Sequence, residues 1–187
     1  MVIGVSGKYC SGKNTVCAIL EKTGWKSLDT DKLGHKALTV KKTELLEVFP
    51  NSILAENGEI DRKKLGRIVF SDKSALEKLE NIVHPWIHGK CREFIKKNDK
   101  AIINAPLIHK RDIHKLCSVV VWVKAPLLVR ISRALKRDGI SLIQVFKRIW
   151  TQRKLNPKYL QKDVDIYIIR NDRRGDLTAQ IESFLKR

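Results

Sequence analysis

Short apolar runs alternate with longer stretches of helical periodicity along most of the chain. Five runs rich in apolar or β-branched residues are expected to be strands: residues 2–5, 25–29, 101–104, 118–123 and 166–169. Between them, apolar residues recur every three or four positions, which is the pattern of a helix with one buried face. Strands that alternate with helices are typical of a parallel sheet. We therefore predict an α/β fold, a five-stranded parallel sheet flanked by helices.

The long interval at residues 32–97 is predicted to form a helical lobe between the second and third strands. Asp61 and Asp72 are placed to cap two of its helices, because a carboxylate accepts hydrogen bonds from the free N–H groups of a first turn. Pro85 lacks an N–H, so it should kink or break the helix that carries it, with a second helical run beyond. This lobe is a candidate for substrate binding.

The first predicted strand leads into a loop with the spacing of a phosphate-binding P-loop. Gly7, Gly12 and Lys13 fit the pattern G-x-x-x-x-G-K, and a helix is expected to begin near Lys13. Glycines let the backbone turn so that successive N–H groups point into one concave nest, and the helix adds its positive end. Lys13 would supply a cation for the outer phosphates of a nucleotide. An ordinary strand–turn–helix connection is the alternative explanation.

Two acidic residues follow the second predicted strand. Asp29 ends that strand, and Asp31 comes two positions later. Open α/β sheets bind ligands at the carboxyl ends of their strands, so both carboxylates are candidates for the site. Asp31 could instead serve only as the cap of a helix predicted over residues 32–38.

Positive charge is the largest departure from an average composition. The 187 residues include 38 Lys and Arg against 20 Asp and Glu, a formal net charge of +18. The lysines are scattered, and aromatic residues make up only 6% of the chain, which leaves few stacking surfaces for bases. The basicity therefore suits small polyanionic substrates, and we expect no specific nucleic-acid partner. A basic nucleic-acid-binding protein with an idle nucleotide site is the alternative.

The cysteines and the apolar runs indicate the compartment. Four cysteines, Cys10, Cys17, Cys91 and Cys117, have neither CxxC nor metal-ligand spacing, so we expect free thiols in a reducing cytoplasm. No apolar run approaches the roughly 20 residues of a membrane span, and the first residues do not resemble an export signal. These features predict a cytoplasmic protein without a membrane partner.

Several motifs, in order along the chain, resemble the dephospho-coenzyme A kinase family, which consists of P-loop kinases of the nucleoside-monophosphate-kinase type. The matching segments are the P-loop, Asp29-Thr30-Asp31, residues 58–72, residues 79–85, Pro106-Leu107-Ile108, Arg133, Arg137-Asp138-Gly139, Arg148-Ile149 and Gln152. The resemblance covers nearly the whole chain. A P-loop alone indicates only a superfamily, whereas the insertion that ends in His84-Pro85, with the paired acids before it, is specific.

The resemblance implies an activity and a set of small-molecule partners. The γ-phosphoryl group of ATP would pass to the ribose 3′-hydroxyl of dephospho-CoA and give CoA and ADP, the last step of coenzyme A biosynthesis. Such a transfer depends mostly on positioning and charge neutralisation, with Mg²⁺ bridging the β- and γ-oxygens. We expect ATP and Mg²⁺ as cofactors and a monomer or a weak homo-oligomer.

The resemblance also implies roles for particular residues. The ATP phosphates would be held by Gly7, Lys8, Tyr9, Cys10, Ser11, Gly12, Lys13, Asn14 and Thr15. The catalytic candidates are Lys13, Asp31 and Arg137. Asp31 would accept or orient the acceptor proton, and Arg137 would face the transferring phosphoryl group as a lid closes. The candidates for contact with dephospho-CoA are Asp31, His84, Pro106, Leu107 and Arg133. Thr15 would be the protein contact nearest Mg²⁺, directly or through water.

Some of these residues have simpler explanations. Arg133, Arg137 and the further candidate Arg148 could be solvated charges on helix faces. Arg133 and Arg137 are four positions apart, however, and therefore share a face. His84 precedes a proline at a helix break, where it could serve structure rather than substrate.

Several positions depart from the family pattern, among them Lys110, which stands near where an acid often follows Pro106-Leu107, and two of them bear on Mg²⁺. Asn14 stands where Ser or Thr normally gives a hydroxyl to Mg²⁺, and Asn104 stands where many members have Asp at the end of the third strand. Both changes should alter the handling of Mg²⁺. We therefore keep two further hypotheses, a P-loop kinase for another small acceptor such as a nucleoside monophosphate, and a family member that binds ATP without turnover.

The resemblance implies one kinase domain over residues 1–187 with three parts. The core would comprise residues 1–31, 98–137 and 163–187, the substrate lobe residues 32–97, and a small lid residues 138–162.

Overall fold

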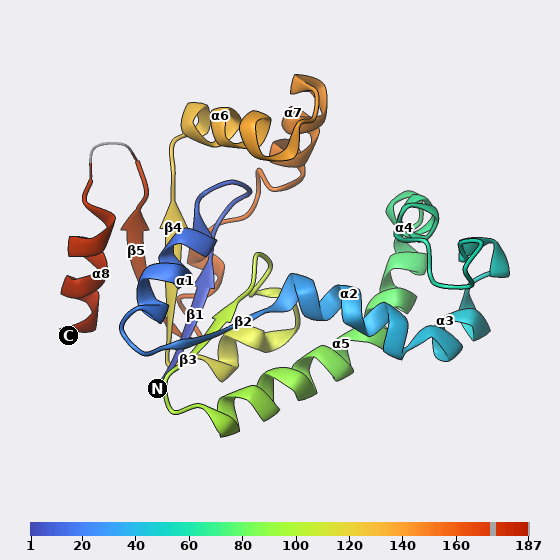
Figure 1. Ribbon diagram of the computed structural model, residues 1–187, viewed down its shortest axis with the longest axis horizontal. Coiled ribbons are helices and arrows are strands. Elements are labelled where there is room, and N and C mark those ends of the chain that lie inside the picture. Colours follow the sequence, from blue (N-terminus) through green and yellow to red (C-terminus); the bar gives the residue numbers. More distant parts are fainter. Residues whose placement is uncertain (173–174, 187) are drawn as a thin grey trace. The chain divides into compact units, whose positions relative to one another are not determined.

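The computed structural model describes residues 1–172 and 175–186, apart from the side chains of residues 110 and 111 (Figure 1). The chain forms two compact units, which we name the sheet unit and the helical unit. The sheet unit comprises Met1–Asp29 and Phe94–Arg187, and the helical unit comprises Thr30–Glu93. In sequence, the helical unit interrupts the sheet unit between its second and third strands.

The five strands form one parallel sheet in the order β2-β3-β1-β4-β5. Their bounds are Val2–Ser6 (β1), Lys26–Asp29 (β2), Ala101–Asn104 (β3), Val119–Lys124 (β4) and Asp165–Arg170 (β5). Every pairing between them is parallel, which confirms the predicted fold class. From the central β1, the sheet continues through β3 to β2 on one side and through β4 to β5 on the other. The carboxyl ends of the central strands are therefore a switch point, where open α/β sheets bind ligands.

The strand register sets which polar residues meet at that edge. Val5 pairs with Asn104, and Asn104 pairs in turn with Asp29 on β2. Ser6, the last residue of β1, pairs with Trp122 on β4. Asp29 and Asn104 thus lie on neighbouring strands at the edge where the glycine loop leaves β1.

Two helices cover one face of the sheet, α1 (Lys13–Glu21) and α8 (Leu177–Leu185). Ile3 and Val5 point into this layer, because every second side chain of a strand faces the same side. The buried residues packed with them are Val16, Cys17, Leu20, Trp25, Ile102, Val121, Val123, Ile169, Ile181 and Phe184. This core fixes the start of α1 against the end of β1, which positions the loop between them.

The segment after β3 packs against the opposite face of β1. A side chain at Gly4 would come within 2.5 Å of Ile108 and 2.9 Å of Cys117, so this segment lies directly on the strand. Its 3₁₀ turn η2 spans Lys110–Leu116 and contains the buried His114. The His114 ring lies 3.1 Å from a carboxylate oxygen of Asp163, which ties this segment to the chain before β5.

Two further helices of the sheet unit, α6 (Leu127–Asp138) and α7 (Leu142–Thr151), form a hairpin after β4. A small core between them contains the buried Ala134 and Val145. Tyr9 and Cys10 of the glycine loop belong to the same core. The hairpin therefore packs on the tip of the loop and brings its charged residues there.

The helical unit has a separate core. Its elements are α2 (Thr30–Val40), α3 (Lys42–Val48), the 3₁₀ turn η1 (Asn51–Ile53), α4 (Arg62–Ser71) and most of α5 (Lys73–Lys97). The core is formed by Leu45, Phe49, Ile53, Leu65, Val69 and Ala75. Asp61 caps α4 by accepting hydrogen bonds from two backbone N–H groups, and Asp72 accepts one from Ser74 at the start of α5. Both predicted caps are confirmed.

The break expected at Pro85 was wrong, and the alternative explanation of Asp31 as a helix cap does not hold. Pro85 does not break its helix, because α5 runs without interruption from Lys73 to Lys97. Asp31 is not a helix cap, because α2 begins one residue earlier and Asp31 lies within its first turn. A carboxylate there still interacts favourably with the helix dipole.

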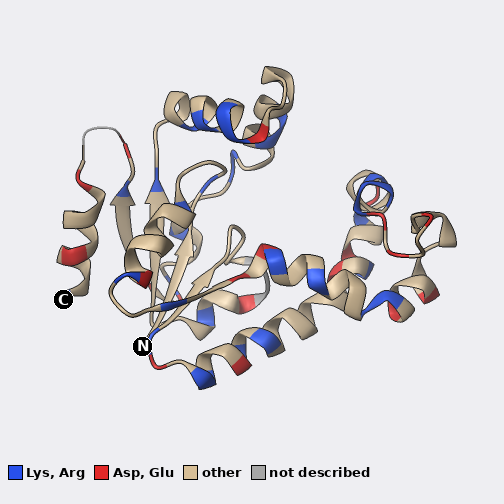
Figure 2. Cartoon of the chain, viewed as in Figure 1, with Lys and Arg blue, Asp and Glu red and all other residues tan. Residues whose placement is uncertain are grey.

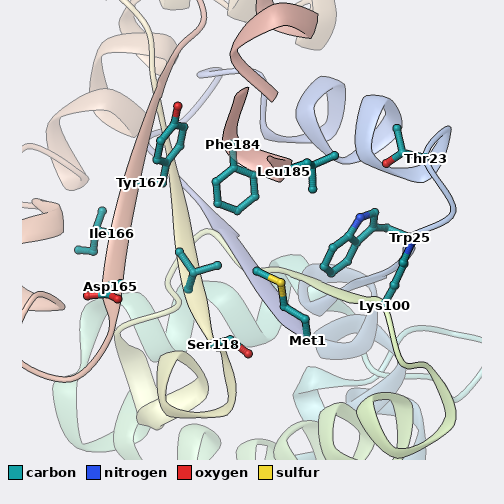
Figure 3. Close-up of a pocket in the computed structure, with 11 residues that line it drawn as sticks. Met1, Thr23, Trp25, Lys100, Ser118, Asp165, Ile166, Tyr167, Phe184 and Leu185 are labelled. Atoms are coloured by element: carbon teal, nitrogen blue, oxygen red, sulfur yellow. The ribbon is translucent and has the colours of Figure 1, made fainter. Parts of the chain in front are cut away.

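A cavity of about 780 Å³ lies at the amino ends of the strands. Its lining includes a residue at or just before the start of each of the five strands, and two further aromatic side chains (Figure 3): Met1, Trp25, Lys100, Ser118, Asp165, Tyr167 and Phe184. The glycine loop leaves the carboxyl end of β1, so the cavity is separate from the candidate site.

Among the described residues, no helix combines the length and apolarity needed to span a bilayer.

Candidate active site

The backbone between β1 and α1 takes a conformation that depends on two glycines. Gly7 has φ 152° and Gly12 has φ 93°, both in the region that disfavours side chains. A side chain at Gly7 would overlap the main-chain carbonyl of Val123, and one at Gly12 would overlap the Asn171 amide. Cys10, with φ 58°, is the left-handed residue between them. The loop can therefore turn its N–H groups inward while its outer side stays in contact with the protein.

Helix α1 starts directly from this loop. The N–H groups of Thr15 and Val16 bond to the carbonyl of Gly12 at 3.1 and 3.2 Å. The Lys13 ammonium donates to the carbonyl of Gly7 at 3.2 Å, so it lies folded along the loop. A helix N-terminus, a concave backbone and an ammonium group are thus brought together, which is the arrangement that binds phosphate groups.

The two asparagines that depart from the family pattern contact one another. The Asn104 Nδ2 donates to the Asn14 Oδ1 at 2.9 Å. Asn104 is only 6% exposed, whereas Asn14 is exposed at the start of α1. Asp29 is the register partner of Asn104 on β2. A pair of neutral amides therefore lies at the position where a hydroxyl and a carboxylate were expected.

Asn171, directly after β5, supports the loop from outside. Its Nδ2 donates to the Ser11 carbonyl at 3.0 Å, and its backbone N–H donates to the Lys124 carbonyl at 2.8 Å. Arg133 reaches the same place, with Nη1 3.3 Å from the Ser11 carbonyl and Nη2 3.0 Å from the Asn171 Oδ1. Arg133 is thus part of the loop's support and not a free charge on a helix face.

Arg130 holds the next stretch of the loop. Its Nε donates to the Tyr9 carbonyl at 2.7 Å, and the residue is 6% exposed. Burial lowers the pKa of Arg130 from its usual range. Burial, followed by the positive charges of Arg130 and Lys124, also lowers the pKa of Lys8. Both cations are therefore held where an anion would relieve a desolvation cost.

Three side chains meet around Asp138, at the end of α6, where the α6–α7 hairpin contacts the tip of the loop. Asp138 accepts bonds from the Arg137 Nε at 2.7 Å, the Arg148 Nη1 at 2.8 Å and the Tyr9 hydroxyl. Both guanidinium groups also lie over the Tyr9 ring, 5.4 and 5.6 Å from its centroid. The Arg137 bond is the main reason that the pKa of Asp138 falls to about 2. Figure 2 shows Lys and Arg distributed along α6 and α7.

A second bond anchors the hairpin to the loop backbone. The Gln152 Oε1 accepts from the Tyr9 N–H at 2.6 Å. The Lys8 ammonium donates to the Arg153 carbonyl at 3.3 Å. Residues from the predicted lid therefore touch the predicted nucleotide loop at both main-chain and side-chain positions.

The remaining predicted site residues lie on other elements. Asp31 is exposed in the first turn of α2, and His84 lies in α5. Among the described residues, the buried His84 Nδ1 has no hydrogen-bond partner. Pro106 and Leu107 follow β3, where the Pro106 carbonyl accepts from the Ser6 hydroxyl at 3.2 Å. The sheet unit therefore gathers the loop and arginine candidates, while Asp31 and His84 belong to the helical unit.

The sequence interpretation missed three contributors. Arg130 was only one of several arginines on a helix, Asn171 was not singled out, and Asp138 was quoted only within a motif. A polar residue directly after a parallel strand, as Asn171 is, was the one signal available. The role of Arg130 depends on a contact across 121 residues of sequence, which no local pattern indicates.

The residues near the loop fit Mg²⁺ in their chemistry. The Asn14 and Thr15 side chains at the start of α1, and the Asp29 carboxylate, offer oxygen atoms, which this hard cation prefers. Among the described residues, no group of three His, Cys, Asp or Glu side chains could hold a metal ion alone. The donor set therefore suits an ion held mainly by substrate phosphates and water.

Comparison with protein families gives one match over most of the chain. The model of the dephospho-CoA kinase family matches residues 1–175. A dephospho-CoA kinase from Fusobacterium nucleatum is 38% identical over 189 residues, covering 98% of this chain and 96% of its own length.

Two solved structures share the fold over nearly the full length. The first is TT1252 from Thermus thermophilus, with a TM-score of 0.82 and 30% identity, covering 100% of this chain and 94% of its own. The second is a dephospho-CoA kinase from Campylobacter jejuni, with a TM-score of 0.71 and 28% identity, covering 99% and 95%.

Proposed function

The chain belongs to the dephospho-CoA kinase family, and we propose that the residues gathered around its glycine loop carry out the reaction of that family. The chain is a phosphotransferase that moves the γ-phosphoryl group of ATP to the ribose 3′-hydroxyl of dephospho-CoA, giving CoA and ADP. The observation that carries the site assignment is the conformation of the loop, with Gly7 and Gly12 at positive φ and Lys13 at the start of α1.

In this proposal the loop residues from Gly7 to Thr15 hold the ATP phosphates. Loop N–H groups other than those of Tyr9 and Ser11, which already bond Gln152 and the Lys8 carbonyl, would donate to the phosphate oxygens together with the N–H groups of Lys13 and Asn14 at the start of α1, where the helix dipole adds to the attraction. Lys13 would exchange the Gly7 carbonyl for an outer phosphate oxygen. Because its ammonium already lies along the loop, this exchange needs only a rotation of a flexible side chain.

Asp31 is the proposed group for the acceptor hydroxyl. The 3′-oxygen attacks the γ-phosphorus, the bond from that phosphorus to the β–γ bridging oxygen breaks, and the hydroxyl proton passes to or toward Asp31. Asp31 lies in the first turn of α2, where the helix dipole interacts favourably with a carboxylate. An ionised carboxylate is the form that can accept this proton.

Arg137, with Arg148 and Arg133, would neutralise charge on the transferring group. An arginine fork pairs with two phosphate oxygens at once, which suits a transition state whose charge is spread over three oxygens. The positions of Arg137 and Arg148 on the hairpin that contacts Tyr9 support this role. Arg133 bonds the loop carbonyl of Ser11 and would act closer to the nucleotide.

Mg²⁺, when bound with ATP, would neutralise charge shared by the β- and γ-phosphates. Asn14, Thr15 and Asp29 are the proposed nearby residues, directly or through water. His84, Pro106 and Leu107 are the proposed contacts for dephospho-CoA. The unpartnered Nδ1 of His84 and the 42% exposure of Leu107 support this.

The test is ADP release by the purified chain with Mg-ATP and dephospho-CoA, beside AMP, CMP and adenosine as acceptors. We expect rapid release with dephospho-CoA alone. Asp31→Asn should lower kcat by about a hundredfold or more while ATP binding persists, since general acid–base catalysis contributes about 10²–10⁴-fold. Lys13→Met should weaken ATP binding itself.

Two results would count against the proposal. A preference for another acceptor would assign the chain to a different kinase reaction. An unchanged kcat in Asp31→Asn would remove that residue from the reaction while leaving the family activity in place. Glu47→Gln, which neutralises an exposed carboxylate on α3, is the matched control and should behave as the wild type.

A further inference from the structure

Asp138 lies at the end of α6 and accepts hydrogen bonds from three different side chains. Its Oδ1 accepts from the Arg137 Nε, and its Oδ2 accepts from the Arg137 Nη2, the Arg148 Nη1 and the Tyr9 hydroxyl. We propose that Asp138 and Tyr9 are positioning residues for phosphoryl transfer, which hold Arg137 and Arg148 side by side at the tip of the nucleotide loop. This inference rests on the proposed function, because it assumes that the two arginines meet the transferring phosphoryl group.

The bonds to Asp138 leave both arginines able to bind an anion. A guanidinium group has five N–H donors. Arg137 gives two of its nitrogens to the carboxylate, and Arg148 gives one. The Asp138 side chain is 16% exposed, whereas the side chains of Arg137 and Arg148 are 60% and 52% exposed. The carboxylate is therefore the covered centre of the cluster, and the arginines are the groups that incoming phosphate can reach.

Without the Asp138 carboxylate, the positive charges of Arg137 and Arg148 would lie over the same Tyr9 ring with no negative charge beside them. Both guanidinium groups lie within 6 Å of the Tyr9 ring centroid, so each feels the charge of the other. Asp138 offsets this repulsion with its negative charge, and its bonds fix the orientation of both guanidinium groups. Arginine is otherwise a flexible side chain, and its fixed orientation is what lets it stabilise a transition state without reorganisation.

Tyr9 connects this cluster to the phosphate site. Tyr9 belongs to the glycine loop, and both polar groups of its main chain are hydrogen-bonded. Its N–H donates to Gln152, and its carbonyl accepts from Arg130. Its hydroxyl bonds Asp138 and also lies 3.1 Å from the Arg148 Nη1. Arg137 and Arg148 are thus held in a fixed position relative to the loop that is proposed to bind the phosphates.

The protonation states agree with this geometry. Bonding to Arg137, then to Tyr9, lowers the pKa of Asp138 to about 2, so the carboxylate is charged throughout the neutral range. The same bond raises the pKa of Arg137 further above its usual range. Burial, and then the bond to Asp138, raises the pKa of Tyr9, which keeps its hydroxyl a donor.

The experiment compares Asp138→Asn, Tyr9→Phe and the control Asp99→Asn. Asp99→Asn removes the same charge from an exposed side chain just before β3. Two quantities are measured for each variant: kcat and KM with dephospho-CoA, and the ratio of the dissociation constants of ADP and the non-hydrolysable triphosphate AMP-PNP. The ratio reports contacts to the terminal phosphate and does not require turnover.

We expect Asp138→Asn to lower kcat by about 10- to 100-fold, because misplacing a charge-stabilising group by about 1 Å can cost two orders of magnitude. The preference for AMP-PNP over ADP should shrink, while ADP binding stays within about twofold of the wild type. Tyr9→Phe keeps the ring and loses the two bonds of the hydroxyl, to Asp138 and to Arg148, so its effect should be in the same direction and about two- to fivefold. Asp138→Glu should recover part of the activity lost in Asp138→Asn.

Three results would overturn the inference. Unchanged kcat and unchanged preference in both variants would show that the arginines need no positioning. Tighter AMP-PNP binding with higher kcat would show that the carboxylate competes with phosphate. An equal loss of ADP and AMP-PNP binding would reduce Asp138 to a structural role. If Asp138→Asn does not fold, Tyr9→Phe decides alone by the same criteria. A wild-type chain without kinase activity would refute the proposed function, yet the ADP to AMP-PNP comparison would still test this inference.

Discussion

At the residue scale, the backbone conformation and the close approach of Asn171 both require glycine at position 12, where the first bonds of α1 also begin. The Gly12 φ of 93° disfavours a side chain, its carbonyl accepts the first bonds of α1, and a Cβ would overlap Asn171. Gly12→Ala should therefore destabilise the fold by about 1–3 kcal/mol and weaken ATP binding by about tenfold or more. Thermal unfolding and equilibrium binding of Mg-ATP measure the two effects.

Gly89 supplies the matched control. It lies within α5, and a Cβ added there would meet no neighbouring atom within 4 Å, so Gly89→Ala should be neutral or stabilising by up to about 1 kcal/mol. Equal behaviour of the two variants would contradict a special role for the Gly12 backbone.

The Asn14–Asn104 contact predicts how this chain depends on Mg²⁺. A neutral amide attracts the cation less than a carboxylate does, and charge count tunes such sites. Asn104→Asp should lower the half-saturating Mg²⁺ concentration for turnover by about three- to tenfold, because it adds a charge beside Asn14. A Mg²⁺ titration of kcat/KM at fixed ATP checks this. Asn98→Asp, directly after α5, is the control and should leave the titration unchanged.

The lowered pKa of Asp138 predicts a contribution to the free energy of unfolding that depends on pH. Its value falls from 3.8 to about 2 on folding, so the unfolded chain binds the proton more tightly than the folded chain does. The stabilisation is therefore complete above about pH 4 and is lost as pH falls toward 2. The difference in Tm between wild type and Asp138→Asn should be largest above pH 4 and should disappear near pH 2. A difference that stays constant over this range would contradict the pairing.

Residues whose role is set by local spacing could be predicted, and residues whose role is set by distant contacts could not. Gly7, Gly12 and Lys13 follow one another within a single loop, so their pattern already carries the backbone geometry. Asn171 supports the same loop across 160 positions of sequence. Its contact exists only because β5 and β1 lie in one sheet.

At the element scale, α5 shows how tertiary packing can outweigh a local signal. Pro85 removes one backbone donor, which favoured a break. Val83, Ile87 and Cys91 are buried at helical spacing, however, and Pro85 itself is on an exposed face. Burial of the apolar side of α5 therefore offsets the free-energy cost of the backbone hydrogen bond that Pro85 removes on the exposed side. The central strands β1, β3 and β4 were easier to predict, because a buried parallel strand is apolar on both faces.

Replacement of that proline should stabilise the helix. Pro85→Ala restores a backbone donor, so we expect a gain of about 1–2 kcal/mol in the free energy of unfolding. Chemical denaturation with kcat measured in parallel checks this. A loss of stability would show that the helix requires the proline geometry, and a loss of kcat alone would point to the neighbouring His84.

At the scale of the whole molecule, the net charge of +18 should govern encounter with the substrates. Both substrates are polyanions, and attraction of this kind is screened by salt. Raising NaCl from about 50 to about 500 mM should lower kcat/KM for dephospho-CoA by about tenfold, while kcat changes by less than about twofold. A salt-independent kcat/KM would contradict electrostatic steering. Duplex DNA of equal charge concentration should inhibit only weakly if no nucleic-acid site exists.

The strand order has a consequence for how the protein is made. β1 is synthesised before its neighbours, yet it lies at the centre of the sheet, and Val2 pairs with Ala101 while Ile3 pairs with Val119. On the ribosome, the chain from Thr30 to Glu93 emerges with its own apolar core before either partner strand of β1 exists. The apolar β1 therefore stays unpaired while the whole helical unit is translated. During that time its exposed apolar residues would be a binding site for nascent-chain chaperones.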